Sequence, residues 1–253
     1  MSKRNTQLRR HAISNLVSER GEVSVDELAH KFETSEVTIR KDLASLEKNG
    51  QLLRRYGGAI SIPTEVIHEE MGQNVSTRKL GLAKAAASLI RDHNRIVIDS
   101  GSTTAALIQQ LNDKRGLVVM TNSLHVANAL NELESEPTLL MTGGTWDTHS
   151  ESFQGKVAES VLRAYDFDQL FIGADGIDLE RGTTTFNELV GLSKVMAEVS
   201  REVIVMIESE KIGRKIPNLE LAWQQIDVLV TDSEIQAEHK LQIEQHGVKV
   251  ICA

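Results

Sequence analysis

Apolar residues recur at helical spacing through residues 8–46 of the chain. Three successive stretches each place their apolar residues on one side of a helix. These residues are Leu8, Ala12, Ile13, Leu16 and Val17, then Val25, Leu28, Ala29 and Phe32, and last Val37, Ile39, Leu43 and Leu46. Gly21 ends the first stretch, Ser24 and Ser35 are suited to cap the next two, and Asn49-Gly50 ends the third. The pattern predicts three helices, with Val37 and the other apolar residues of the third helix turned inward.

A short helix, a tight turn at Glu33-Thr34 and a longer helix form the helix-turn-helix pattern. The segment from Gln51 to Ile60 follows, and its apolar residues alternate around Gly57-Gly58 as in a short β-hairpin. Three helices and a hairpin make a winged helix-turn-helix, which we assign to residues 1–60.

The second helix of such a pair lies in the major groove, with its early residues facing the base edges. Arginine can pair with guanine through two atoms, and both arginine and lysine bind phosphates. The expected DNA-contact residues are Ser35, Glu36, Thr38, Arg40 and Lys41 on this helix, and Arg54, Arg55 and Tyr56 on the hairpin. The alternative is that these basic residues only line a solvated surface. The order of all four pieces, with basic residues at both contact places, favours DNA binding.

Charge differs between the two parts of the chain. The net charge is -8, but residues 1–60 hold 11 Lys+Arg against 8 Asp+Glu, so they carry +3 and the remaining residues carry -11. A basic segment ahead of an acidic body favours nucleic acid as a partner. The single cysteine, Cys252, fits a reducing compartment, and no apolar run approaches the roughly 20 residues needed to cross a bilayer. We expect a cytoplasmic protein without a membrane segment, secretory signal, metal site or cofactor.

Beyond a linker at residues 61–77, apolar runs alternate with amphipathic helices. The runs are Arg95–Asp99, Leu117–Thr121, Thr138–Thr142, Gln169–Gly173, Glu202–Ile207, Asp227–Thr231 and Val248–Cys252. The helical segments are Leu80–Ile90, Thr104–Leu111, Leu124–Leu133, Lys156–Ala164, Glu188–Ser200 and Glu234–Gln245. This alternation predicts an α/β domain with a mainly parallel sheet at residues 78–253. Such sheets bind ligands beyond the carboxyl ends of their strands.

Polar, glycine-containing loops follow the predicted strands. The first strand leads into Asp99 to Thr104 and then a helix, where hydroxyl groups and backbone amides favour an anion such as phosphate. Further loops of this kind are Thr121 to Ser123, Thr142 to Thr145, Gly173 to Asp178, Thr183 to Glu188 and Ser209 to Lys211. Each loop could be an ordinary capped turn. Their convergence at one edge of a parallel sheet favours a binding site.

The N-terminal motifs give the chain a specific resemblance. Thr38 to Leu43, then Leu46-Glu47 and Gly50, then Arg54 to Ala59, resemble the signature of the DeoR family of bacterial transcription regulators. The resemblance implies that Asp42 is a structural partner of an arginine or a helix end, because a carboxylate beside DNA phosphates would be repelled. The second half is similar to the sensor domain of this family, which resembles ribose-5-phosphate isomerase and glucosamine-6-phosphate deaminase.

The resemblance implies an effector site for a phosphorylated sugar. Its phosphate cradle would be Ser100, Gly101, Ser102, Thr103 and Thr104, with Asp99 orienting the loop or a sugar hydroxyl. The other expected effector-binding residues are Asn122, Gly143, Gly144, Asp175, Glu188 and Lys211. Asp147 stands where family members often carry a basic residue, so the effector could differ in charge or hold an amine.

These features predict a transcriptional regulator, a repressor of a carbohydrate or amino-sugar operon, that a phosphorylated sugar releases from double-stranded DNA. One alternative is a sugar-phosphate isomerase or deaminase with an accessory DNA-binding module, in which Asp175 or Glu188 would be the general base. Another is a DNA-binding protein with an empty, vestigial pocket. We also expect a homo-oligomer, a dimer or tetramer, since dimers match paired half-sites; helices of the second domain are the expected contact.

Overall fold

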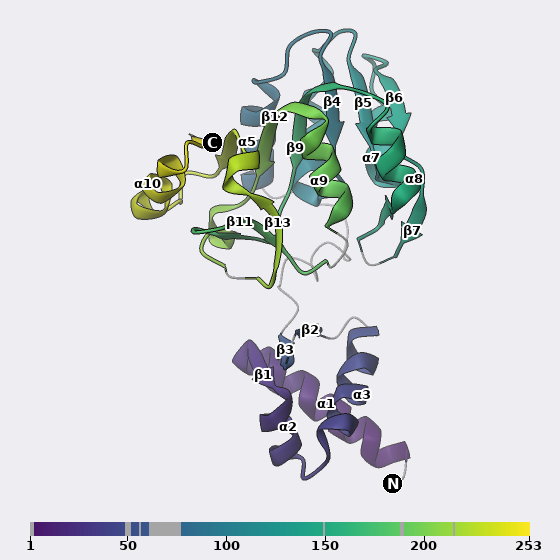
Figure 1. Ribbon diagram of the computed structural model, residues 1–253, viewed down its shortest axis with the longest axis vertical. Helices are drawn as coiled ribbons and strands as arrows, with labels where there is room; N and C mark the ends of the chain where they lie inside the picture. Colours follow the sequence, from purple (N-terminus) through teal and green to yellow (C-terminus); the bar gives the residue numbers. More distant parts are fainter. Residues whose placement is uncertain are drawn as a thin grey trace. The chain divides into compact units, whose positions relative to one another are not determined.

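The computed structural model describes residues 3–48, 52–55, 57–60, 77–148, 150–187, 190–214 and 216–253. The chain divides into two compact units, Met1–Gln73 and Asn74–Ala253 (Figure 1). The predicted linker at residues 61–77 lies outside the described residues except for Thr77, and so do Tyr56 and Glu188. No helix in the described part of the chain is long and apolar enough to cross a membrane.

The N-terminal unit is a winged helix-turn-helix, as predicted. Its elements are α1 (Lys3–Arg20), β1 (Glu22–Ser24), α2 (Val25–Lys31), α3 (Glu36–Lys48), β2 (Leu53–Arg55) and β3 (Gly58–Ile60). The predicted hairpin, β2 and β3, gains β1 as a third antiparallel strand, in the order β1-β3-β2. Ser24 caps α2, since the Glu27 backbone N–H donates to Ser24 Oγ at 3.1 Å.

One core holds this unit together, and it corrects one prediction. Ile13 and Val17 of α1, Leu28 of α2 and Ile39 of α3 are fully buried in it. Val37 was predicted to face the core, but it is 59% exposed. Ile39 follows Val37 by two positions, and two positions turn a helix by about 200°, so the two side chains occupy opposite faces of α3.

The C-terminal unit is built on a seven-stranded parallel sheet in the order β15-β14-β12-β9-β4-β5-β6. Its strands are β4 (Arg95–Ile98), β5 (Val118–Thr121), β6 (Thr138–Met141), β9 (Phe167–Ile172), β12 (Ser200–Met206), β14 (Val228–Thr231) and β15 (Lys249–Cys252). Five strands lie within the predicted apolar runs, while β9 and β12 each begin two residues before theirs. The runs were recognisable because strands of a parallel sheet are buried on both faces.

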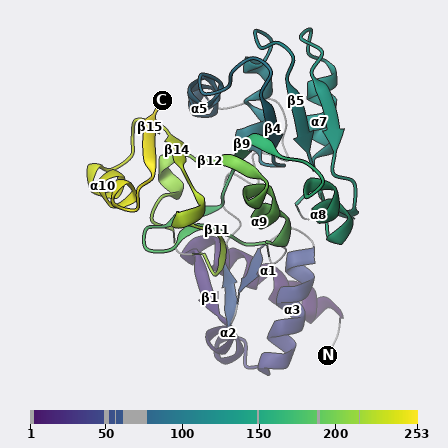
Figure 2. The same cartoon turned by 45° about the horizontal axis from the view of Figure 1, so that its top comes forward.

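Helices cover both faces of this sheet. They are α5 (Thr77–Ala87), α6 (Ser102–Ala105), α7 (Leu124–Asn131), α8 (Lys156–Leu162), α9 (Gly191–Glu198) and α10 (Ala237–Gln245), with 3-10 turns η1 (Ile108–Gln110), η2 (Ser209–Lys211) and η3 (Trp223–Gln225). Val97 points into the core with α8, α9 and α10, while its neighbours Ile96 and Ile98 face α5 and α7. Figure 2 shows α5 and α9 on opposite sides of the sheet.

Two small antiparallel sheets were missed by the sequence analysis. One is β10 (Gly176–Asp178), β11 (Gly182–Thr185) and β13 (Asn218–Ala222), and the other is β7 (Thr145–Asp147) with β8 (Ser152–Gln154). The segment from Thr183 to Thr185, predicted as a loop, is therefore a buried strand. The predicted helix Thr104–Leu111 is instead divided between the short α6 and η1.

Candidate DNA-contact surface and effector site

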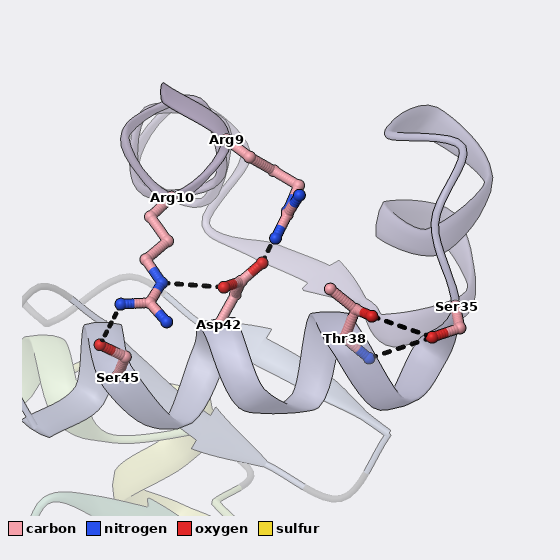
Figure 3. Close-up of polar contacts among 6 residues, drawn as sticks. All are labelled: Arg9, Arg10, Ser35, Thr38, Asp42 and Ser45. Atoms are coloured by element: carbon pink, nitrogen blue, oxygen red, sulfur yellow. Dashed lines mark hydrogen bonds and ion pairs between the residues drawn. The ribbon is translucent and has the colours of Figure 1, made fainter. Parts of the chain in front are cut away.

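The first turn of α3 is fixed by the residue before it. Ser35 precedes the helix and accepts a hydrogen bond from the Thr38 backbone N–H at 3.3 Å, and the two side-chain hydroxyls lie 3.0 Å apart (Figure 3). This capping satisfies an amide that the helix itself leaves unpaired. It also orients the start of α3, where the sequence analysis places the base contacts.

Asp42 anchors the middle of α3 to α1. Its carboxylate is 2% exposed, and Arg9 Nε and Arg10 Nε donate to its two oxygens at 2.6 and 2.8 Å. Arg10 also donates from Nη1 to Ser45 Oγ at 2.6 Å (Figure 3). The interpretation of Asp42 as an arginine partner is therefore confirmed, and the residue faces the inside of the unit.

The three arginines predicted to contact DNA each pair with a glutamate of the same unit. Arg40 Nη2 lies 2.7 Å from Glu36, and Arg54 Nε lies 2.6 Å from Glu47. Arg55 Nη1 lies 2.7 Å from Glu22 of β1. All three arginine side chains are at least 39% exposed. Exposed ion pairs contribute about 0–1 kcal/mol, so phosphates can displace these glutamates at little cost.

The outward face of α3 carries one residue that sequence reasoning misplaced. Val37 lies three residues before Arg40 and four before Lys41, so these side chains share one side of the helix. Arg40 and Lys41 are exposed, as is Val37. The signal that could have placed it outward was its spacing from Ile39, since residues two apart cannot share a helix face.

In the C-terminal unit, Asp99 joins two strand-end loops. Its carboxylate accepts hydrogen bonds from the Gly101 N–H at 3.0 Å, from the Gly173 N–H at 2.8 Å and from the Thr104 hydroxyl. The loop after β4 is thus tied to the loop after β9. Burial raises the pKa of Asp99 above its usual value, while these hydrogen bonds lower it. The contacts place Asp99 as an organiser of the loop.

The predicted phosphate cradle forms the loop and short helix after β4. Thr103 and Thr104 are buried, and the Thr104 hydroxyl also lies 2.7 Å from the Gly101 carbonyl oxygen. Ser102 Oγ accepts a hydrogen bond from Lys79 Nζ of α5 at 2.7 Å. Lys79 was missed because it lies 23 residues before Ser102 in the chain. It brings a positive charge to the cradle.

Acidic side chains gather near the same loops. Asp175 accepts hydrogen bonds from the Thr185 hydroxyl at 2.7 Å and the Phe186 N–H at 3.0 Å. Glu220 of β13 accepts one from Ser193 at 2.7 Å. Burial, followed by the negative charges of Asp99 and Asp175, raises the pKa of Glu220 to about 8. Glu220 was also missed, because Ser193 lies 27 residues before it in the chain.

The remaining predicted effector residues differ in their surroundings. Asn122, 3% exposed, donates to the Phe153 carbonyl at 3.5 Å, and its Oδ1 has no hydrogen-bond partner among the residues that the structure describes. Lys211 lies in η2 beyond the carboxyl end of β12. Asp147 accepts hydrogen bonds from the Ser150 N–H and hydroxyl at 3.1 and 2.6 Å, which brace the turn between β7 and β8.

Gly143 and Gly144 follow β6, and both adopt positive φ, +57° and +117°. A Cβ on Gly144 would lie 2.6 Å from the Gln154 carbonyl oxygen, so a close backbone approach requires glycine there.

A groove of about 490 Å³ runs along α8 and is lined by Lys156, Val157, Ser160, Val161, Ala164 and Tyr165. None of the predicted effector residues that the structure describes lines this groove.

A winged helix-turn-helix joined to an α/β unit with a polar strand-end edge defines the class of ligand-responsive transcription regulators. The sequence model of the DeoR C terminal sensor domain matches residues 74–233, and that of the DeoR-like helix-turn-helix domain matches residues 9–65. The chain therefore belongs to the DeoR family of transcriptional regulators.

Two curated relatives are similar over nearly their whole length. An Escherichia coli O157:H7 protein named for transcriptional repression of the aga operon is 39% identical over 252 residues, 97% of this chain and 93% of that protein. The HTH-type transcriptional regulator GlpR of Haloferax volcanii is 30% identical and covers 96% of both chains. Among solved structures, ribose 5-phosphate isomerase A of Methanocaldococcus jannaschii is 21% identical and covers 53% of both chains, with a TM-score of 0.38.

Proposed function

We propose that this DeoR-family regulator is a repressor that grips a double-stranded operator with α3 and the hairpin β2–β3, and that a phosphorylated sugar in the C-terminal unit releases it. The single observation that carries the DNA-binding half is the outward face of α3. It presents Arg40 and Lys41 to solvent, while Asp42 turns inward to Arg9 and Arg10. The face thus offers positive charge without a competing carboxylate from Asp42.

The effector half rests on the loops at the carboxyl ends of β4, β5, β9 and β12. Asp99 holds two of these loops together, and Ser102, Thr103 and Thr104 supply hydroxyl groups. Lys79 adds a positive charge at Ser102, and Lys211 lies at the same edge of the sheet. Phosphate is recognised by this combination of hydroxyls, backbone amides and ammonium groups.

The regulated genes are proposed to serve carbohydrate or amino-sugar metabolism, as suggested by the relative that is named for repression of the aga operon. A sugar phosphate that binds one conformation better than the other would shift the DNA-binding equilibrium. The repressor would act as a dimer or tetramer on paired half-sites, in the cytoplasm, where a bacterial operator is found.

One experiment separates the regulator from an isomerase or deaminase. The purified chain is incubated with hexose, hexitol and hexosamine phosphates while turnover and release from its own upstream region are followed together. Release without turnover is the expected result. Turnover without release would support the enzyme, and neither response to any sugar phosphate would support a vestigial pocket.

A further inference from the structure

Val37 is a large apolar side chain on the DNA-facing side of α3. It is 59% exposed, whereas Ile39, Leu43 and Leu46 of the same helix are at most 2% exposed. Single exposed apolar residues are common on protein surfaces, so exposure alone has little meaning. What distinguishes Val37 is its place in the first turn of the second helix, where a helix-turn-helix contacts base edges.

The neighbours of Val37 restrict what it can contribute. Glu36 and Arg40 pair with each other at 2.7 Å, and Ser35 and Thr38 share a hydrogen bond at the helix start. These groups can exchange hydrogen bonds with bases or phosphates. A valine side chain has no donor or acceptor, so it can gain free energy only by covering an apolar group.

The major groove offers one such group, because the C5 methyl of thymine is the apolar feature among its donors and acceptors. We propose that Val37 reads a thymine by packing against this methyl group, once in each half-site of the operator. The inference rests on the proposed operator binding through α3 and extends it to the base that is read. Lys41, four residues further on the same side of the helix, would reach the phosphates beside this thymine.

Deoxyuridine provides the test, because it lacks only the thymine methyl group. Each thymine of the footprinted operator is replaced singly by deoxyuridine, and duplex binding is measured by fluorescence anisotropy at fixed salt. For the wild-type chain, one position in each half-site should raise Kd about four-fold, which corresponds to about 0.8 kcal/mol for a buried methyl-sized group. The other positions should change Kd less than two-fold.

Val37→Ala should weaken binding to the all-thymine operator and lose the response at that position alone. The matched control is Val157→Ala on α8, which truncates a similarly exposed valine, 63% exposed, in the other unit. The control should keep the wild-type response. Because Val37 is exposed, its truncation should leave the fold intact. The deoxyuridine measurements on the wild-type chain do not depend on any variant, so they test the proposal even if Val37→Ala fails to fold.

Two outcomes would overturn the assignment of Val37: a wild-type chain that responds to deoxyuridine at no position, or a Val37→Ala variant that responds as the wild type does. Both presuppose an operator that is bound. If the wild-type chain binds no duplex from its upstream region, the proposed DNA binding itself fails and the inference falls with it.

Discussion

At the scale of single residues, Asp42 shows how one buried carboxylate holds the DNA-binding unit together. Removing it leaves Arg9, which is 10% exposed, and Arg10 without their shared partner. Breaking a buried pair costs about 3–5 kcal/mol, and the partial exposure of Arg10 places the expected loss for Asp42→Asn near the lower end. Chemical denaturation of the full chain, followed by a probe in the N-terminal unit, measures this loss.

The matched control for Asp42→Asn is Glu27→Gln, which removes the exposed partner of Arg20. Such exposed pairs contribute about 0–1 kcal/mol, so the control should unfold nearly as the wild type does. Equal stability of Asp42→Asn and the control would contradict the role assigned to Asp42.

Lys79 is the residue by which the proposed effector site is tested most directly. Its ammonium group lies 2.7 Å from Ser102 Oγ, so Lys79→Met removes a positive charge from the cradle. A charge-assisted hydrogen bond contributes about 1.5–3 kcal/mol, and the affinity for a sugar phosphate should fall at least ten-fold in calorimetric titrations. Lys84→Met, on the exposed side of α5, should bind normally. Equal losses in both variants would remove Lys79 from the site.

Glu220 gives the C-terminal unit a distinctive pH dependence. Its pKa is raised from 4.5 to about 8 by burial and by Asp99 and Asp175. Below pH 4.5 the carboxyl of Glu220 is protonated in both the folded and the unfolded chain. Between 4.5 and 8 the unfolded carboxyl loses its proton while the folded one keeps it, so its contribution to the free energy of unfolding falls as pH rises. Above pH 8 that contribution no longer changes.

Glu220→Gln should therefore lose less stability than the wild type between pH 5 and 8. Thermal unfolding at half-unit pH steps measures the difference between the two chains. Glu180→Gln, at an exposed turn, should follow the wild-type curve. A Glu220→Gln curve parallel to the wild type across this range would show that the buried carboxyl is ionised at neutral pH.

At the scale of elements, the sequence predicted what depends on local pattern and missed what depends on distant contacts. The seven parallel strands were found because each contains a run of apolar residues. The strand from Gly182 to Thr185 was missed because threonine and glycine carry no apolar signal, although the strand is buried. Lys79 and Glu220 were missed for the related reason that their partners, Ser102 and Ser193, lie 23 and 27 residues away in the chain.

The two glycines Gly143 and Gly144 follow β6, and two different physical reasons favour glycine at these positions. Gly143 has φ +57° and nothing within 4 Å of an added Cβ, so Gly143→Ala should cost only the left-handed backbone penalty of about 1–2 kcal/mol. Gly144→Ala adds a clash with the Gln154 carbonyl oxygen and should cost more. Denaturation of the two variants makes the comparison. Equal losses would mean that β8 can move aside, and that packing does not explain Gly144.

At the scale of the whole molecule, the proposal requires that ligand binding to one unit changes the affinity of the other unit for its own ligand. If a sugar phosphate weakens operator binding by some factor, operator must weaken sugar-phosphate binding by the same factor, since the coupling is reciprocal. Typical couplings are about 1–3 kcal/mol, or 5–150-fold. We expect equal factors within this range when Kd for operator is measured with and without effector, and Kd for effector with and without operator.

Lys79→Met makes this comparison decisive, because it should alter the effector measurements and leave effector-free operator binding unchanged. The salt dependence of that operator binding reports the phosphate contacts of the N-terminal unit, so it should match the wild type. A sugar phosphate that binds tightly while both operator measurements stay constant would show that the units act independently. In that case the chain would bind DNA and ligand without being regulated by the ligand, and the proposed release mechanism would be wrong.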